Sequence, residues 1–303
     1  MPELRLKTVT RTQGNNAALK DGTVRPEGLA FEFVEVDPLI RAFRLMVREL
    51  AYDVSELAFT TYLCAKEHGK QITALPIFLV RGFHHGAIVG RGAGEPRALE
   101  GEKVGVSRGY TVTTGVWARG VLADEYGVDL DKVTWMLSGD EHVAEYRPPE
   151  NVVSIEPGRS LDELVVAGEL AAAIGVDGEG LTPLIPNAEE AGFDALRRRG
   201  HYPINHLVVV KDELLGANPE LGRQIFDAFA AAKDLYVERL RNDELEDPTP
   251  ADRMYKRVWE ITGSDPLPYG VEPNRAAIEE LIDHAVHQKI LRRRPAVESL
   301  FAD

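Results

Sequence analysis

The stretch RGFHHGAIVG, residues Arg81 to Gly90, decides the fold of this chain. Its glycines and apolar residues are typical of a strand that passes close to another part of the molecule. Successive strand residues point to opposite faces, so the adjacent His84 and His85 cannot both face one core. We therefore expect a strand here, with one of the two histidines facing a cleft, solvent or a partner.

The composition around this stretch is that of an ordinary globular protein. The chain has 303 residues, enough for one large domain or two of usual size. Hydrophobic residues make up 44% and charged residues 28%. The net charge of −14 would repel nucleic acid and anionic membranes, so we expect neither as a partner.

The ends and the apolar runs carry no sign of export or membrane insertion. The first residues, MPELRLKTVTRTQGNN, lack the apolar segment of a secretory signal. Apolar runs such as HLVVV, residues 206–210, are far too short to span a bilayer. We expect a cytoplasmic protein, with a homo-oligomer left open. The single cysteine, Cys64, excludes an internal disulfide.

Strand and helix patterns alternate along the first two thirds of the chain. Alternating or buried apolar runs at 4–10, 29–36, 72–80 and 202–210 predict strands. Apolar residues at helical spacing predict helices at 37–50 and 111–127, the second closed by Gly127. From Asp212 onward the pattern is almost entirely helical. The chain is therefore predicted to be an α/β protein with a helical C-terminal region.

Two helix starts carry groups that suit an acid. In VGVSRGYTVTTGVW, residues 104–117, a strand is followed by a loop and a helix start rich in hydroxyls. DVSELAFTTYL, residues 53–63, repeats this order. Ordinary N-capping explains each start equally well, but two together would suit a ligand with two acidic groups. The candidate binding residues are Ser55, Thr60, Ser107, Arg108, Tyr110, Thr111, Thr113 and Thr114.

The remaining histidines give weaker signals. His206, beside Asn205, precedes a fully apolar strand and could be structural or catalytic. His284 and His287 are spaced three apart on a helix, but the sequence indicates no third ligand, so no metal site is predicted. The chain contains no GxGxxG after its first strand, no GxSxG and no HExxH. No cofactor is predicted.

Several of these stretches together resemble the 4,5-dihydroxyphthalate decarboxylase family. The similarity covers nearly the whole chain in order, and its most specific parts are DGTVRPEG with DVSEL and, near the C-terminus, PYGVEPNRAAIEELI. The resemblance implies a type 2 periplasmic-binding-protein-like fold, in which two crossing strands join two α/β lobes. It implies one lobe from 1–84 plus 207–303 and another from 85–206, with His85 and His206 meeting in the cleft.

The family motifs transfer residue by residue. The family usually reads Arg-x-Phe-Arg-His-Ser where this chain has RGFHHG, so Arg81 and His85 match, while His84 replaces the second arginine. His206 matches the histidine of Pro-Ile-x-His-Thr. After the first strand this chain has QGNN, containing Asn15 and Asn16, instead of Tyr-Asp-Arg-Thr. The Asp-Arg pair of the family pattern is therefore absent here.

The resemblance implies a non-oxidative decarboxylase of a hydroxylated aromatic acid, acting in aromatic compound catabolism. His85 or His206 would donate the proton, Arg81 would hold a carboxylate, and the helix start at 107–114 would hold the other. Glu56 or Asp177 could polarise a phenolic hydroxyl or tune a histidine. The alternative is a solute-binding protein for a small carboxylate, because the same cleft serves both functions.

Overall fold

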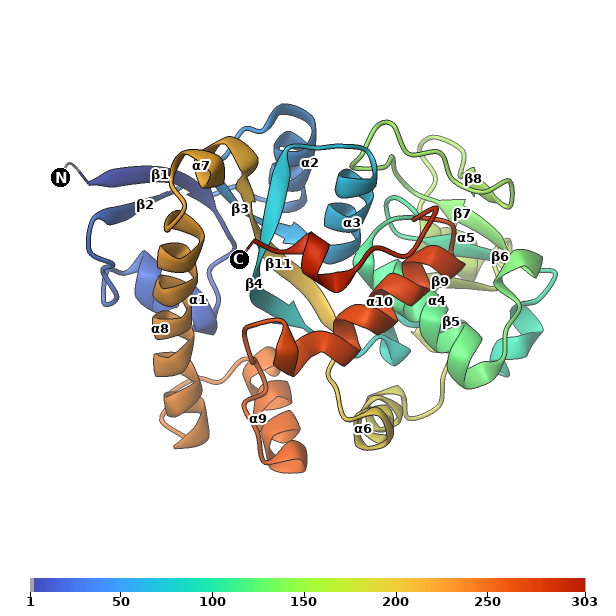
Figure 1. The fold of residues 1–303 in the computed structure, drawn as a ribbon. Coiled ribbons are helices and arrows are strands. Elements are labelled where there is room, and N and C mark those ends of the chain that lie inside the picture. The colour runs from blue at the N-terminus through green and yellow to red at the C-terminus, as the bar shows by residue number, and fades with distance from the viewer. Residues whose placement is uncertain (1–2, 303) are drawn as a thin grey trace. The chain divides into compact units, whose positions relative to one another are not determined.

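The computed structural model describes residues 3–302 and divides into two compact units (Figure 1). The first unit contains the chain up to Arg81, then Ile204–Ile278, and the residues from Pro295 on. The second contains Gly82–Pro203 and Glu279–Arg294. The boundaries expected from the sequence lay at 84/85 and 206/207, with all residues after 206 in the first lobe.

The first unit is built on a five-stranded sheet of order β2-β1-β3-β11-β4. Strands β1, β2 and β3 run parallel, and β11 is antiparallel to both of its neighbours. The strands are β1 (Leu4–Val9), β2 (Leu29–Phe33), β3 (Val54–Ala58), β4 (Ile72–Arg81) and β11 (Ile204–Lys211). The helices are α1 (Gly14–Lys20), α2 (Ile40–Glu49), α3 (Phe59–Glu67), α7 (Asp212–Ala217), α8 (Leu221–Arg241), α9 (Pro250–Thr262) and the start of α10 (Arg275–His287).

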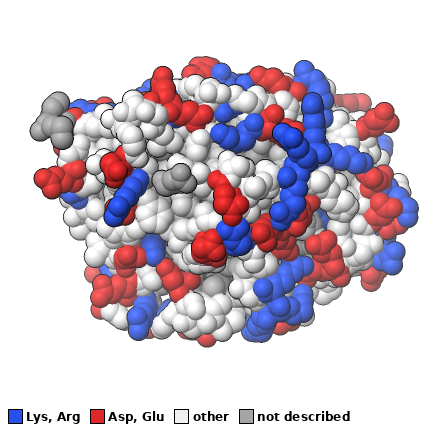
Figure 2. Space-filling model, viewed as in Figure 1, with Lys and Arg blue, Asp and Glu red and all other residues white. Residues whose placement is uncertain are grey.

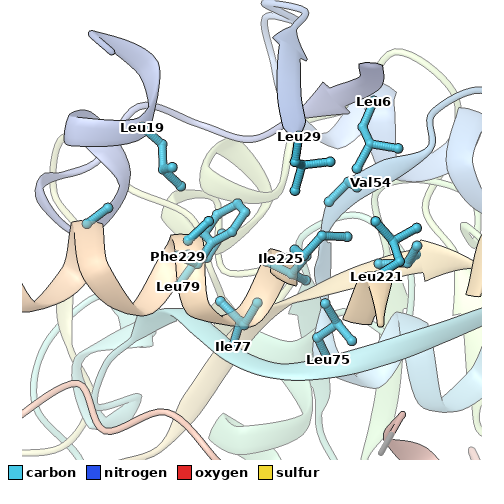
Figure 3. Close-up of a cluster of buried hydrophobic side chains, with 14 residues drawn as sticks. Leu6, Leu19, Leu29, Val54, Leu75, Ile77, Leu79, Leu221, Ile225 and Phe229 are labelled. Carbon is cyan, nitrogen blue, oxygen red and sulfur yellow. The ribbon is translucent and has the colours of Figure 1, made fainter. Parts of the chain in front are cut away.

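The apolar patterns of the sequence account for the core of this unit. Leu19 of α1 and Ile225 and Phe229 of α8 pack with apolar residues of the sheet (Figure 3). Leu207–Val210 of β11 are fully buried, and Val208 and Val210 belong to the apolar cluster that includes Ile225 and Phe229 of α8. A strand covered on both faces needs a continuous apolar run, which is what HLVVV provides.

One edge of this sheet collects the polar residues of the unit. The carboxyl ends of β1, β3 and β4 and the amino end of β11 lie along the same edge, as the parallel and antiparallel pairings require. The pairing of β11 with β4 is irregular on both sides of His206. Such bulges re-aim side chains, so the irregularity sets the direction of this histidine.

The second unit has its own six-stranded sheet of order β10-β5-β9-β6-β7-β8. Its four strands from β9 to β8 are parallel, and β5 and β10 are antiparallel additions. The strands are β5 (Ile88–Gly90), β6 (Lys103–Val106), β7 (Thr134–Leu137), β8 (Val152–Ser154), β9 (Ala172–Ile174) and β10 (Thr182–Pro183). The helices are α4 (Thr113–Tyr126), α5 (Leu161–Val166), α6 (Ala188–Arg199) and the remainder of α10.

The prediction of a strand over residues 81–90 was wrong. Strand β4 ends at Arg81, a 3₁₀ turn covers His85–Ala87, and only Ile88–Gly90 form a strand. His84 and His85 are 4% and 3% exposed, so both are buried. The rule that adjacent side chains face opposite ways holds for an extended strand, and a turn does not obey it.

The surface carries many charged side chains, and the described helices do not have the character of membrane spans. Acidic and basic side chains both cover the face of the molecule shown in Figure 2. None of the helices within residues 3–302 combines the length and apolar character that crossing a bilayer requires.

Candidate functional site

His206 and Glu56 form a close pair at the polar edge of the first sheet. Nδ1 of His206 lies 2.6 Å from Oε1 of Glu56, although 150 positions separate them in the chain. Glu56 lies opposite Val208 in the ladder, so His206 is its diagonal neighbour on β11. The Glu56 side chain is fully buried, whereas that of His206 is 16% exposed.

The surroundings of this pair fix the carboxylate and the ring. The second oxygen of Glu56 accepts the backbone N–H of Arg11 at 2.9 Å. The ring of Phe43 meets the imidazole edge to face, with 5.3 Å between centroids. No hydrogen bond joins Nε2 of His206 to any of the residues 3–302 that the structure describes. The pair is thus an oriented imidazole with one nitrogen held and the other available for proton transfer.

The other candidates in the first unit have protein partners. The Arg81 guanidinium donates to Asn274 Oδ1 and to the carbonyl of Pro268, and lies over the ring of Phe78. Asn15 Nδ2 donates to the carbonyl of Leu79 at 2.9 Å. These contacts join α1, β4 and the segment before α10 into one polar framework.

The remaining candidates of the first unit are buried or half-buried residues of α1, β3, α3 and β11. Asn16 Nδ2 donates to Thr10 Oγ1 and to the carbonyl of Arg11. Ser55 and Thr60, at the two ends of the β3–α3 junction, are fully buried. Asn205 is half-buried on β11.

In the second unit, His85 pairs with a carboxylate that sequence reasoning missed. Its Nε2 lies 3.0 Å from Oε1 of Glu125, on α4. Glu125 also faces Arg198 at 2.9 Å and Arg199 at 3.3 Å. Burial raises the pKa of Glu125, but the hydrogen bond with His85 and the charges of His85 and both arginines outweigh it, so this pKa lies below its ordinary value.

His84 has a different environment from its neighbour. Its ring stacks on the indole of Trp117, with 6.2 Å between centroids and 15° between planes. His85 belongs to the second unit and His206 to the first. That the two histidines meet in one cleft stays a prediction.

The predicted acid-binding loop before α4 already holds a carboxylate. Glu141 accepts the backbone N–H of Tyr110 at 2.5 Å and that of Thr111 at 3.2 Å, and the Thr111 hydroxyl at 2.6 Å. The acid that this loop holds is the protein's own, and the binding of a ligand acid there stays a prediction.

The other candidates of the second unit lie just before this loop, at the start of α4 and after β9. The N–H of Ser107 donates to the carbonyl of Ile174, and Arg108 has a positive φ of 70°. Thr113 and Thr114 are the first residues of α4. Asp177 is exposed, in the chain that follows β9.

A groove of about 940 Å³ lies in the first unit, against α1, α8 and α9, and its lining includes Arg11, whose backbone N–H binds Glu56. Asn15 is the one sequence candidate among its lining residues. Its charged lining is mostly acidic, with Asp21, Glu238, Glu244, Glu246, Asp247 and Asp252 against Arg11 and Arg239. An acidic groove repels an acidic ligand, so we place the candidate site at the Glu56–His206 pair.

Comparison with solved structures defines the class of fold. The aliphatic sulphonate binding protein SsuA from Escherichia coli matches with a TM-score of 0.57 and 10% identity, over 100% of this chain and 98% of that one. The desulfurization enzyme DszB matches with a TM-score of 0.53 and 12% identity, over 98% of this chain and 96% of that one. The chain has the two-lobe fold of type 2 periplasmic binding proteins, as predicted.

Comparison with curated proteins is more specific. The 4,5-dihydroxyphthalate decarboxylase of Comamonas testosteroni is 27% identical over 319 aligned positions, which cover 98% of this chain and 96% of that protein. The Pseudomonas putida protein of the same name is 31% identical over 168 positions, 52% of this chain and 64% of that protein. No family model matches. The resemblance to the 4,5-dihydroxyphthalate decarboxylases is thus confirmed.

Proposed function

We propose that this protein is a non-oxidative decarboxylase of a dihydroxylated aromatic acid of the phthalate type. The likeness to proteins named 4,5-dihydroxyphthalate decarboxylase supports the reaction class. The observation that carries the proposal is the 2.6 Å contact between His206 and the buried Glu56. A histidine held in this way can deliver a proton, and proton delivery is the main chemical task of this reaction.

In the proposed mechanism, the substrate's own hydroxyl supplies the electrons. A hydroxyl para to the leaving carboxylate makes the carbon that bears this carboxylate electron-rich. The proton on Nε2 of His206 passes to that carbon, which interrupts the aromatic ring. The bond to the carboxylate then breaks, carbon dioxide leaves, and the electron pair of that bond restores the ring. From 4,5-dihydroxyphthalate the product is 3,4-dihydroxybenzoate, with no change of redox state.

Glu56 has two tasks in this scheme. Because it accepts a hydrogen bond from Nδ1, it keeps the proton to be transferred on Nε2. Its negative charge also stabilises the imidazolium before the transfer. Each turnover consumes one proton, and the exposed fraction of the His206 side chain, 16%, allows water to return it.

We propose that two of the sequence candidates bind the carboxylates of the substrate. Arg81 lies at the end of β4, on the same edge of the sheet as His206, and would hold one carboxylate by exchanging a protein partner for it. The loop before α4 would hold the other, since it already binds the carboxylate of Glu141.

The second candidate function is binding without catalysis, of a small carboxylate or another anion. It is favoured by the fold, which this chain shares with a sulphonate binding protein. The two functions differ in one measurable respect, because a binding protein releases no carbon dioxide.

The test incubates the full chain with 4,5-dihydroxyphthalate, measures carbon dioxide release and ring absorbance, and follows binding in parallel by calorimetry. We expect one carbon dioxide per 3,4-dihydroxybenzoate formed, with phthalate bound but unchanged because it has no hydroxyl. Binding of both compounds with no carbon dioxide from either would support the binding protein instead. Neither binding nor turnover would overturn both candidates for this substrate class.

A further inference from the structure

Helices α4 and α10 approach each other closely within the second unit, at Gly120. A Cβ added at Gly120 would lie 2.4 Å from Nε2 of His284, so only glycine leaves room for this imidazole. The ring of His284 also meets the indole of Trp117 edge to face at 5.3 Å. The close approach brings one imidazole nitrogen against α4.

Two carboxylates share this place with the histidine. Asp124 lies one turn after Gly120 on α4, and Glu280 lies one turn before His284 on α10, on the same face. One ligand atom from each of Asp124, Glu280 and His284 lies within 4.8 Å of the other two. One imidazole nitrogen and two carboxylate oxygens at this spacing can surround a single ion.

The burial of His284 and its lack of a hydrogen bond to any described residue point to a ligand, independently of the two carboxylates. It is 4% exposed, and its Nε2 lies 3.8 Å from Glu280 Oε1, which is too far for a hydrogen bond. No hydrogen bond from its ring is found within residues 3–302. A largely buried imidazole that lies beside two carboxylates, without a hydrogen bond to either, is suited to sharing an ion with them.

We propose that Asp124, Glu280 and His284 bind one divalent transition-metal ion of the Zn²⁺ class. Imidazole and carboxylate are ligands that Zn²⁺ takes in proteins, and three protein ligands leave a position open for water. Arg199 and His201 hold the Glu280 carboxylate from outside the cluster and orient it. The positive charge of Arg199 weakens the site, so we expect modest affinity.

The ion would bind the C-terminal segment to the core of the second unit. Asp124 belongs to the continuous stretch Gly82–Pro203, whereas the other two ligands belong to the separate segment Glu279–Arg294. A ligand that binds only the folded state raises the melting temperature by mass action. The inference is independent of the proposed decarboxylation, because it concerns binding and stability.

The test uses the full chain, freed of metal by a chelator and dialysed. Zn²⁺ binding is measured by calorimetry, Co²⁺ binding by visible absorption, and the melting temperature with and without Zn²⁺. We expect one ion per chain and a rise of about 3 °C or more at saturating Zn²⁺. Asp124→Asn changes an exposed residue and should fold, yet weaken binding by at least about 10-fold.

Matched controls separate this site from adventitious binding. His287→Asn and Asp283→Asn alter an exposed histidine and an exposed carboxylate of α10 outside the cluster, and should leave binding unchanged. His284→Gln should abolish the Co²⁺ absorption that reports the imidazole. The inference is overturned if the wild-type chain binds no ion, if Asp124→Asn and His284→Gln bind as the wild type does, or if His287→Asn is the variant that loses the ion.

Discussion

Each of the two units holds a histidine–glutamate pair, but the carboxylates have different partners. In the first unit, Glu56 lies 2.6 Å from His206, and its other oxygen accepts one backbone N–H. In the second unit, Glu125 lies 3.0 Å from His85 and also pairs with two arginines of α6. The side-chain types are the same, but the two pairs differ in their neighbours, in the ring nitrogen that faces the carboxylate and in the exposure of the histidine.

This difference separates a pair suited to proton transfer from one suited to structure. No arginine or lysine side chain among residues 3–302 pairs with Glu56, so its charge is available to an imidazolium at His206. The charge of Glu125 is already balanced by arginines, which reduces what it offers His85. His85 is also 3% exposed, against 16% for the His206 side chain. The comparison therefore supports His206 as the proposed proton donor.

The largest expected effect comes from removing the proposed donor. His206→Gln should lower turnover by about 10² or more, because general acid catalysis typically contributes this much. Substrate binding should change far less. His85→Gln serves as the matched variant, and we expect it to lose less than about 10-fold. Steady-state carbon dioxide release and calorimetric binding provide the two readouts, and equal losses in both variants would break the comparison.

Removing the charge of Glu56 should have the next largest effect. Glu56→Gln keeps the size of the side chain but loses the anion, so we expect turnover to fall at least about 10-fold. Glu125→Gln tests the other pair. If both variants reduced turnover alike, the arginines around Glu125 would not make the difference we ascribe to them.

The fold was predictable from the sequence because its signals are local and repeated. The run HLVVV indicated the buried strand β11, and Gly127, with φ of 65°, ends α4 as predicted. The prediction for residues 81–90 was wrong because a 3₁₀ turn at His85–Ala87 separates two strands there. The rule of alternating faces does not apply across such a turn.

The candidate site was only partly predictable. Glu56 was a candidate through the family resemblance, and the structure places it in β3, against His206. Glu125 gave no local signal, since it lies in the last turn of α4, 40 positions from His85, and only the packing of α4 against the 3₁₀ turn joins them. The sequence likewise indicated only His284 and His287 as possible metal ligands. It could not show the cluster around His284, because Asp124 comes from another helix.

The Glu125–His85 pair should contribute more to the free energy of unfolding than the Glu56–His206 pair does. Glu125→Gln removes the anion shared by Arg198, Arg199 and His85, of which Arg199 keeps a second partner in Glu280, so we expect the free energy of unfolding to fall by roughly 1–3 kcal/mol. Urea denaturation monitored by circular dichroism measures this. An unchanged midpoint would contradict a structural role for this pair.

The stability lost in Glu125→Gln should depend on pH in the direction set by the lowered pKa of Glu125. The pKa of Glu125 lies below its ordinary value of 4.5, because the contacts with His85 and the two arginines outweigh the effect of burial. The charged form is therefore favoured by folding, and its contribution is fully present above about pH 4.5. It is lost as pH falls through the lowered pKa. The difference between the wild type and Glu125→Gln should shrink in that acidic range and stay constant near pH 7.

The smallest expected effect is that of Arg198, the exposed member of the second network. Its side chain is 58% exposed, so solvent and salt screen its 2.9 Å contact with Glu125. Arg198→Ala should therefore lower the free energy of unfolding by less than about 1 kcal/mol, and by still less in 1 M salt. Arg199→Ala is the matched variant, because Arg199 is 27% exposed and also pairs with Glu280. Urea denaturation of both variants at low and high salt should show the larger and less salt-sensitive loss for Arg199→Ala. The reverse order would mean that burial does not set the strength of this network, and the contrast drawn with the isolated Glu56 would lose its physical basis.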